Sequence, residues 1–372
     1  MRLLDVIENF IYQSNRRRFV GFVLALSFFK AGVWYIPNLD SSWVISLNPV
    51  SNPFTDPLSD YLMWNWLSPF LTWRLGIHSE QSFLYFHLLF SIAFTCIFIV
   101  RIWAQFQERD ARTSLVIFAA LPVSATAYFW IGMDSVTLLL MLLLLLVRRH
   151  AWIAMPIGVL LGMQHFEQGL VAFGALVLAS LLSLCLKTRS EYSISWATAS
   201  LAGVIFGKIV LLVIFSHYGI HVNTGRLYVL QSYSRQCLGE FYYRWQYILW
   251  SVCGVGWIAV AKYIEQGKAT APFVISLCGL TLLLPLVQDQ TRVLAIVSFP
   301  LLTTFLLLNL RFLESLHGRL TSAIFGLWVV IPYPWVWRGV PRVSISSYDI
   351  AYILHRLFGW FHVPPNQPQW PL

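Results

Sequence analysis

The sequence predicts an all-α integral membrane protein with about eleven transmembrane helices. Of its 372 residues, 58% are hydrophobic and only 11% are charged, and the mean hydropathy is +0.67. An ordinary soluble domain carries about 25% charged residues, so this chain has too few to cover a soluble surface. The apolar residues also gather in blocks, several of which are long enough to cross a bilayer. These observations exclude a soluble globular enzyme.

Eleven apolar blocks are the predicted spans, within a range of ten to twelve. Several reach the roughly 17–25 residues that cross a bilayer, but 136–147 and 152–163 are short. Backbone groups inside a membrane need protein or water partners, so short blocks beside polar residues predict broken or tilted helices around a cavity formed by the extracytoplasmic loops. In order, the predicted spans are 19–37, 83–100, 115–131, 136–147, 152–163, 170–186, 194–215, 247–261, 271–287, 293–308 and 320–335.

The basic residues predict the orientation. With the N-terminus in the cytoplasm, about 15 of the 25 Lys and Arg residues fall on inside loops, in agreement with the positive-inside rule. The net charge of +9 is then a topology signal, and we expect no nucleic-acid partner. We expect a multi-pass protein of a bacterial inner (plasma) membrane, with its active site on the extracytoplasmic side.

We expect residues 1–335 to form a single transmembrane domain and residues 336–372 to form an extracytoplasmic or interfacial tail. The start of the chain, 1–18, is polar and mildly amphipathic and lacks a cleavage site for a signal peptide. Its five cysteines give no disulfide framework and no metal-type pair. We predict a short interfacial helix whose side toward the lipid headgroups carries Leu3, Leu4, Ile7, Phe10 and Ile11.

The first outer segment, 38–81, carries three carboxylates and no basic residue before Arg74. A carboxylate at the lip of an apolar cavity has a raised pKa and can accept a proton from a hydroxyl nucleophile. We therefore predict Asp40, Asp56 and Asp60 as candidate catalytic residues. The alternative is that Asp40 and Asp60 cap the helices that follow them.

Polar residues also interrupt the apolar runs at two other predicted outer ends. Asp134 stands in a tight turn before a Leu-rich run, and His165, Glu167 and Gln168 lie between two apolar segments. Ionisable groups at such depths usually face a cavity or a partner, so we predict that these four bind substrate. The alternatives are an N-cap for Asp134 and a hydrogen bond of His165 or Glu167 that closes a broken helix. We predict no cofactor; His-x-Glu lacks a third ligand, which leaves a divalent metal open without predicting one.

Arginines in two outer segments complete the predicted substrate-binding set. Arg292 at a helix mouth can clamp a phosphate bidentately, and we predict that Asp289 beside it also binds substrate. The alternative is that Asp289 and Arg292, three residues apart, form a simple pair that stabilises the turn. Arg226 and Arg235 lie among tyrosines in the segment 216–246. That mixture suits phosphates and sugars, and it equally suits an ordinary interfacial belt. Lys30 and Lys208 lie inside spans and receive no role from the sequence.

The order of these features resembles the membrane glycosyltransferases of the GT-C superfamily over about residues 19–310. The resemblance rests on an outer loop with an early Asp40, an aromatic stretch at 67–76, Asp134 before a Leu-rich helix, a Gly-rich unit at 158–163, and Thr291-Arg292 leading to Phe299-Pro300. In that superfamily the Gly-rich unit often leads to a Lys-containing turn, where this chain has Gln164-His165-Phe166-Glu167-Gln168.

The resemblance implies a polyprenyl-phosphate or polyprenyl-diphosphate sugar donor from the bilayer, with Asp40 as general base and Arg292 as a donor-phosphate ligand. We accordingly expect an enzyme that transfers a hexosyl or pentosyl group to an extracytoplasmic envelope glycan or lipid-linked acceptor. One alternative is an O-antigen or exopolysaccharide polymerase, which uses similar substrates. The other is a non-enzymatic flippase or transporter of lipid-linked glycans, against which stand the short inside loops and the lack of internal repeats.

Overall fold

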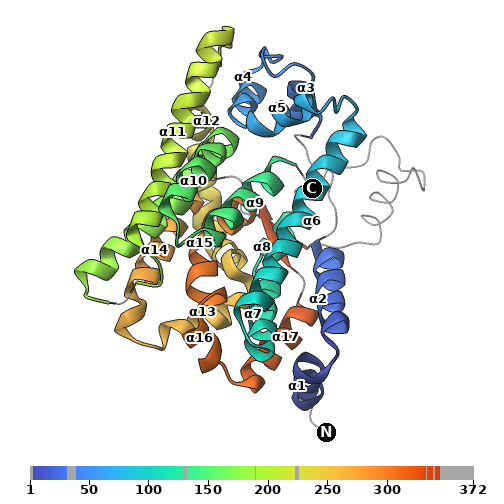
Figure 1. Cartoon of the computed structure of the whole chain (residues 1–372), viewed down its shortest axis with the longest axis vertical. Helices are drawn as coiled ribbons and strands as arrows, with labels where there is room; N and C mark the ends of the chain where they lie inside the picture. Colours follow the sequence, from blue (N-terminus) through green and yellow to red (C-terminus); the bar gives the residue numbers. More distant parts are fainter. Residues whose placement is uncertain are drawn as a thin grey trace.

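The computed structural model describes residues 3–31, 39–129, 132–188, 190–222, 226–287, 289–331, 333–337 and 340–343. These residues form a bundle of α-helices with one short antiparallel β-hairpin (Figure 1). The predicted helical class is confirmed, and the hairpin is a feature that the sequence did not predict.

The N-terminal quarter of the chain forms short helices at two places in the bundle. Two helices begin the chain, and three short helices with one 3-10 turn then form a group at one end of the molecule, seen at the top of Figure 1. The segments are α1 (Leu3–Gln13), α2 (Arg16–Ala31), α3 (Leu39–Leu47), α4 (Pro57–Asp60), η1 (Tyr61–Trp64) and α5 (Leu67–Arg74).

The body of the bundle consists of further helices, most of them longer. They are α6 (Glu80–Gln105), α7 (Glu108–Ala120), α8 (Val123–Phe129), α9 (Met133–Leu146), α10 (Ala151–Cys185), α11 (Ile194–Tyr218) and α12 (Arg226–Cys253). The C-terminal part is η2 (Gly254–Gly256), α13 (Trp257–Ile264), η3 (Lys268–Thr270), α14 (Ala271–Thr281), η4 (Leu284–Leu286), α15 (Gln290–Leu302), the π-helical turn η5 (Thr303–Leu307), α16 (Leu310–Ser315), α17 (Gly318–Val330), β1 (Pro334–Trp337) and β2 (Val340–Val343).

Within the described residues, five helices are long and apolar enough to cross a membrane, which supports the predicted membrane character by length and composition. They cover Glu80–Gln105, Ala151–Cys185, Ile194–Tyr218, Arg235–Ile264 and Gln290–Leu307, and three shorter apolar helices accompany them. The predicted count of about eleven spans is not confirmed, because several predicted blocks fold as shorter or interrupted helices. The block 115–131, for example, is divided at Pro122, which has no N–H to continue α7, so that α8 begins at Val123.

The chain reverses direction within α10. His165 has non-helical dihedral angles (φ −159°, ψ 83°), and a Cβ added at Gly169 would contact the side chain of Leu161. Eight residues of straight helix would separate these positions by about 12 Å, so the arms on either side of His165 must lie against each other. The two predicted blocks 152–163 and 170–186 are therefore two arms of one helical hairpin, with the polar segment 164–168 at its tip.

The first arm of α10 packs closely against α11 through four glycines. A Cβ at Gly162 would lie 2.1 Å from the carbonyl oxygen of Val204, and one at Gly207 would lie 2.1 Å from that of Val159. Gly158 and Gly203 are packed just as closely one turn away. This is the small-xxx-small contact by which membrane helices bring their backbones together. Gly158 and Gly162, which contribute to the GT-C resemblance, thus have a packing role here.

Helix α1 docks onto the protein, which corrects the expectation that its apolar side faces lipid headgroups. Ile11 is fully buried, and Ile7 and Phe10 pack against the core. The Phe10 ring contacts those of Phe19 on α2 and Phe325 on α17. Only Leu3 and Leu4 of the predicted face remain exposed. The apolar side is occupied because two neighbouring helices present an aromatic surface to it.

Lys30, to which the sequence assigned no role, caps the C-terminal end of α17. Its ammonium is buried and donates hydrogen bonds to the carbonyl oxygens of Trp328 and, at 2.6 Å, of Ile331. A cation at these carbonyls satisfies groups that the helix leaves unpaired and complements the helix dipole. Lys30 therefore joins α2 to α17.

The β-hairpin pairs Pro334 with Val343 and Trp337 with Val340. Its first strand lies across the predicted domain boundary between residues 335 and 336. The remainder of the predicted tail, 344–372, lies outside the described residues.

The glycine contact between α10 and α11 predicts that Gly207→Ala destabilises the protein. The added methyl group meets the backbone of Val159, and overpacking of this kind lowers the free energy of unfolding by about 1–3 kcal/mol. Thermal unfolding of the detergent-solubilised protein measures the effect. Gly174→Ala on the second arm of α10 is the control, because nothing lies within 4 Å of its added Cβ and Ala favours helix over Gly. Equal melting temperatures for the two variants would contradict the assignment.

Candidate functional site

Three ionisable side chains from distant parts of the chain meet within the bundle. The Nε atom of Arg292, in the first turn of α15, lies 3.0 Å from Oδ2 of Asp134 and 3.0 Å from Oδ2 of Asp289. The exposed fractions of the three side chains are 16%, 5% and 12%, respectively. We call Asp134, Asp289 and Arg292 the ion triad. The structure therefore brings together three of the predicted substrate-binding residues.

The ion triad decides between the alternatives that the sequence left open for these residues. Asp134 lies in the first turn of α9, whose N-cap residue is Gly132, and its carboxylate pairs with Arg292 rather than capping its own helix. The pair of Asp289 and Arg292, three residues apart, does form. It is not an isolated turn contact, because Asp134 joins it from a helix about 150 residues earlier in the chain. The triad thus links α9 to the start of α15.

The ion triad carries more negative than positive charge when both carboxylates are ionised. Burial raises the pKa of Asp289 to about 6, Arg292 opposes the rise, and the Asp134 carboxylate adds to it. The side chain of Tyr61 from η1 also interacts electrostatically with Arg292. The short helices at the end of the molecule therefore reach the triad.

A second set of polar contacts holds the helices around the ion triad. The buried Gln164 at the tip of α10 donates from Nε2 to the carbonyl oxygen of Met133 (3.0 Å), next to Asp134. Its Oε1 accepts a hydrogen bond from the backbone N–H of Ser68 (2.9 Å). One amide thereby fixes the tip of α10 against α5 and the first turn of α9. Since such groups lack water partners in an apolar bundle, satisfied contacts position the helices firmly.

Ser68 and His87 extend this set to α6. Nδ1 of His87 lies 2.8 Å from the carbonyl oxygen of Phe83, so Nδ1 carries the proton and Nε2 accepts from the Ser68 hydroxyl. The hydroxyl of Ser135 in turn donates to the carbonyl oxygen of His87 (3.0 Å). Ser68 and His87 are both fully buried, so this pair positions helices and is closed to a substrate. The sequence does not reveal the Ser68–His87 pair, because each residue is a solitary polar group in an apolar run.

The turn at 165–168 is held by its own residues, as the alternative interpretation predicts. Nδ1 of the buried His165 accepts a hydrogen bond from the backbone N–H of Gln168 (3.4 Å) and lies 3.6 Å from Oε2 of Glu167. The Gln168 side chain is buried as well, and its Oε1 accepts no hydrogen bond from the described residues. The turn therefore contains a buried amide oxygen that no described residue satisfies.

The three predicted catalytic carboxylates have different surroundings. Asp60 is buried and accepts a hydrogen bond from Nδ2 of Asn52, which also donates to the carbonyl oxygen of His221 (2.9 Å). Asp60 precedes Tyr61, so it belongs to the segment that reaches the ion triad, and its side chain makes no helix-capping hydrogen bond. Asp56 is exposed and accepts from the Ser59 hydroxyl (3.2 Å) at the start of α4.

Asp40 lies in α3, and its side chain is outside the described part of the structure. The predicted arginines of α12 are not brought to the ion triad by any described contact. Arg235 is exposed, and the side chain of Arg226 is not among the described ones. For Arg235, the surface position agrees with the interfacial-belt alternative.

Lys208 is a cation near the predicted site to which the sequence assigned no role. It projects from the middle of α11, with Nζ 3.3 Å from the centroid of the Trp64 ring and 5.6 Å from that of Phe166. Trp64 belongs to η1, and Phe166 belongs to the tip of α10. Cation–π contacts of this kind stabilise an ammonium that is partly removed from water. Only the spatial arrangement could reveal this contact, because Lys208 stands alone in an apolar block.

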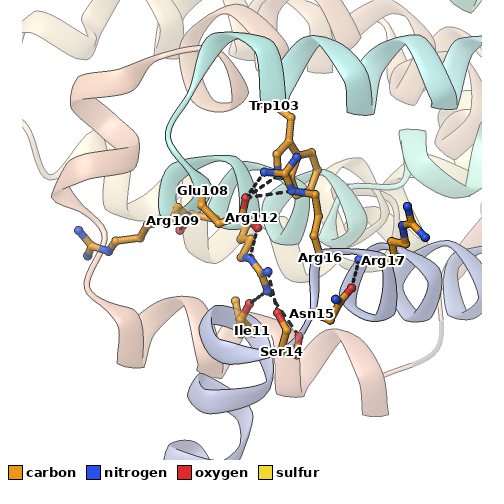
Figure 2. A network of polar contacts seen from close by, with 10 residues as sticks. Ile11, Ser14, Asn15, Arg16, Arg17, Trp103, Glu108, Arg109 and Arg112 are labelled. Carbon is orange, nitrogen blue, oxygen red and sulfur yellow. Dashed lines mark hydrogen bonds and ion pairs between the residues drawn. The ribbon is translucent and has the colours of Figure 1, made fainter.

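A different polar network joins the end of α1 and the start of α2 to the segment where α6 meets α7, and it has a structural role (Figure 2). The Glu108 carboxylate accepts hydrogen bonds from Arg16 (2.5 and 3.0 Å), Arg112 (2.7 Å) and Trp103 (3.1 Å). Burial raises the pKa of Glu108, but these donors outweigh it and leave the pKa below its ordinary value. The guanidinium of Arg112 also donates to the carbonyl oxygens of Ile11 and, at 2.8 Å, of Ser14, so this network holds the end of α1.

The fold and the site together are those of a helical bundle that has several helices long and apolar enough to cross a membrane and a buried cluster of opposite charges. No known protein family, no curated protein and no solved structure matches this chain. Within the described ranges, no group of three or more His, Cys, Asp or Glu side chains is placed to hold a metal ion.

The ion triad predicts a large loss of stability in Arg292→Met. That change leaves two buried carboxylates without their cation and lowers the free energy of unfolding by about 3–5 kcal/mol. The compensated variant Arg292→Met with Asp134→Asn and Asp289→Asn removes the buried charges and recovers most of the stability. Thermal unfolding in detergent compares the two variants. A compensated variant no more stable than Arg292→Met alone would show that the charges do not balance one another.

The raised pKa of Asp289 predicts a pH dependence of stability. Folding raises this pKa from 3.8 to about 6, so between these values the folded protein holds a proton that the unfolded chain releases. The contribution of this group to stability therefore increases as the pH falls from 7 to 4. Melting temperatures across this range should rise more on acidification in the wild type than in Asp289→Asn. Identical pH profiles would contradict the assignment.

Proposed function

We propose that this protein is a membrane glycosyltransferase that moves a hexosyl or pentosyl group from a polyprenyl-phosphate or polyprenyl-diphosphate donor to an envelope glycan or lipid-linked acceptor on the extracytoplasmic side. The observation that carries the proposal is the meeting of carboxylates and cations from separate segments in one region. Asp60 and Tyr61, the ion triad, the tip of α10 and Lys208 all contribute to it.

Glycosyl transfer needs both a carboxylate and a cation. The acceptor hydroxyl oxygen forms a bond to the anomeric carbon while its proton passes to a carboxylate. The bond between the anomeric carbon and the phosphate oxygen breaks, and its electron pair leaves with the lipid phosphate. Cations or N–H donors stabilise the charge that grows on that phosphate.

Two carboxylates are proposed for the role of general base. Asp40 takes it by the GT-C resemblance, and Asp60 is favoured by its surroundings, because it is buried in the segment that reaches the ion triad. Asp56 is disfavoured by its exposure and by its local contact with Ser59.

Two cations are proposed for the donor phosphate. Arg292 can contribute, although two carboxylates already lie 3.0 Å from its Nε atom and a phosphate would share it with them. Lys208 lies on α11, whose surface also carries the exposed Phe206 and Ile209.

The proposal predicts that Asp40→Asn or Asp60→Asn lowers transfer by a factor of about 100 or more, because each removes a candidate base. Mass spectrometry of envelope glycans from a deletion strain complemented with each variant measures transfer, and melting temperatures establish folding. Asp56→Asn is the matched control and retains activity. Retained transfer in all three variants with loss in Arg226→Gln, Arg235→Gln and Arg292→Gln would favour the polymerase instead. If the aspartate and the arginine variants all retain full transfer, the enzyme proposal is wrong.

A further inference from the structure

Three arginines meet at the end of the bundle opposite the ion triad. Arg101 lies near the end of α6, and Arg148 and Arg149 follow α9. The hydrogen bond from Ser135 to the carbonyl oxygen of His87 sets the level of α9 beside α6. Arg101 comes fourteen residues after His87 along α6, and Arg148 comes thirteen residues after Ser135 along α9 and the turn that follows it. Each arginine therefore lies about 20 Å beyond that hydrogen bond, at a similar level of the bundle. The electrostatic repulsion of Arg148 by Arg101 agrees with this placement.

Protein groups leave these arginines poorly neutralised. Arg148 is repelled by Arg101 and Arg149 and attracted by Glu191. Within the described part of the chain, none of the three arginines has a carboxylate within 4.0 Å, and Nε of Arg101 is buried without a hydrogen-bond acceptor. Arg16 and Arg112, by contrast, are satisfied by Glu108 and backbone carbonyls (Figure 2). A partly buried cluster of like charge is destabilising unless an anion joins it.

The cluster lies beside surface that suits lipid. Val100, next to Arg101, is 67% exposed, and Trp152, shortly after Arg149, is 77% exposed. Tryptophan beside arginine is typical of a membrane–water interface, where the ring lies among the headgroups. An anion that binds the arginines at this interface would be the phosphate group of a lipid, with the acyl chains of that lipid along α6 and the first arm of α10.

We propose that Arg101, Arg148 and Arg149 bind the phosphate group of an anionic phospholipid. A guanidinium donates two parallel hydrogen bonds to a phosphate, and three of them around one anion convert mutual repulsion into shared attraction. The bound lipid joins α6 to the turn between α9 and α10. This site is independent of the proposed glycosyl transfer, because it lies at the other end of the bundle.

The test compares the detergent-solubilised wild type with Arg101→Gln/Arg148→Gln. Phosphatidylglycerol, phosphatidylcholine and inorganic phosphate are the three probes, read by melting temperature and by native mass spectrometry. Phosphatidylglycerol should raise the melting temperature of the wild type most, and its Kd should be about tenfold weaker for the variant. Without added lipid the variant should be at least as stable as the wild type, since it loses repulsion.

Arg311→Gln/Arg319→Gln is the matched control, because it removes the same charge from two exposed positions and should keep wild-type lipid binding. Equal stabilisation of all three proteins by phosphatidylglycerol would overturn the site. Stabilisation by inorganic phosphate that equals that by phosphatidylglycerol and depends on Arg101 and Arg148 would overturn the lipid as its occupant. A variant markedly less stable without lipid would also count against the proposal, because it would give the arginines a structural partner in the protein.

Discussion

The structure depends on one electrostatic constraint, which is that a charge inside an apolar bundle must find an opposite charge. Arg292 meets Asp134 and Asp289 with little solvent exposure, and this contact joins the start of α15 to the start of α9. Since a lone buried charge is far more destabilising than a paired one, the positions of these two helix ends are coupled. The short helices at that end of the molecule reach the same place through Tyr61.

Contacts between uncharged groups position the other helices around the ion triad. The tip of α10 is held beside Asp134 by the two hydrogen bonds of Gln164, and four glycines let the first arm of α10 approach α11. This close packing brings Phe166 and Lys208 toward Trp64. A polar region with carboxylates, cations and an amide oxygen therefore results from helix packing, and it is the arrangement on which the proposed glycosyl transfer rests.

Much of the site was predictable residue by residue, but its connections were not. Asp134, Asp289 and Arg292 stand out in the sequence because each interrupts an apolar run, and the pair three residues apart could be foreseen. The link from Asp134 to Arg292 could not, because it joins residues 158 positions apart. The contacts of Ser68, His87 and Lys208 were not predictable, since a single polar residue in an apolar block does not reveal its partner. Asp56 and Asp60 look alike in sequence and differ only in burial.

The sequence by itself determined the helical class, the apolar character of the chain and the polar turns between its apolar blocks, because these follow from composition and from hydrophobic length. Tertiary structure decided which blocks become long helices: Pro122 divides one, and the reversal at His165 makes two blocks a hairpin. It also decided that Ile11 faces protein and that Arg112 and Lys30 hold helix ends. The physical reason is that hydropathy measures only whether a side chain avoids water, whereas its contact with protein or lipid depends on which helix packs beside it.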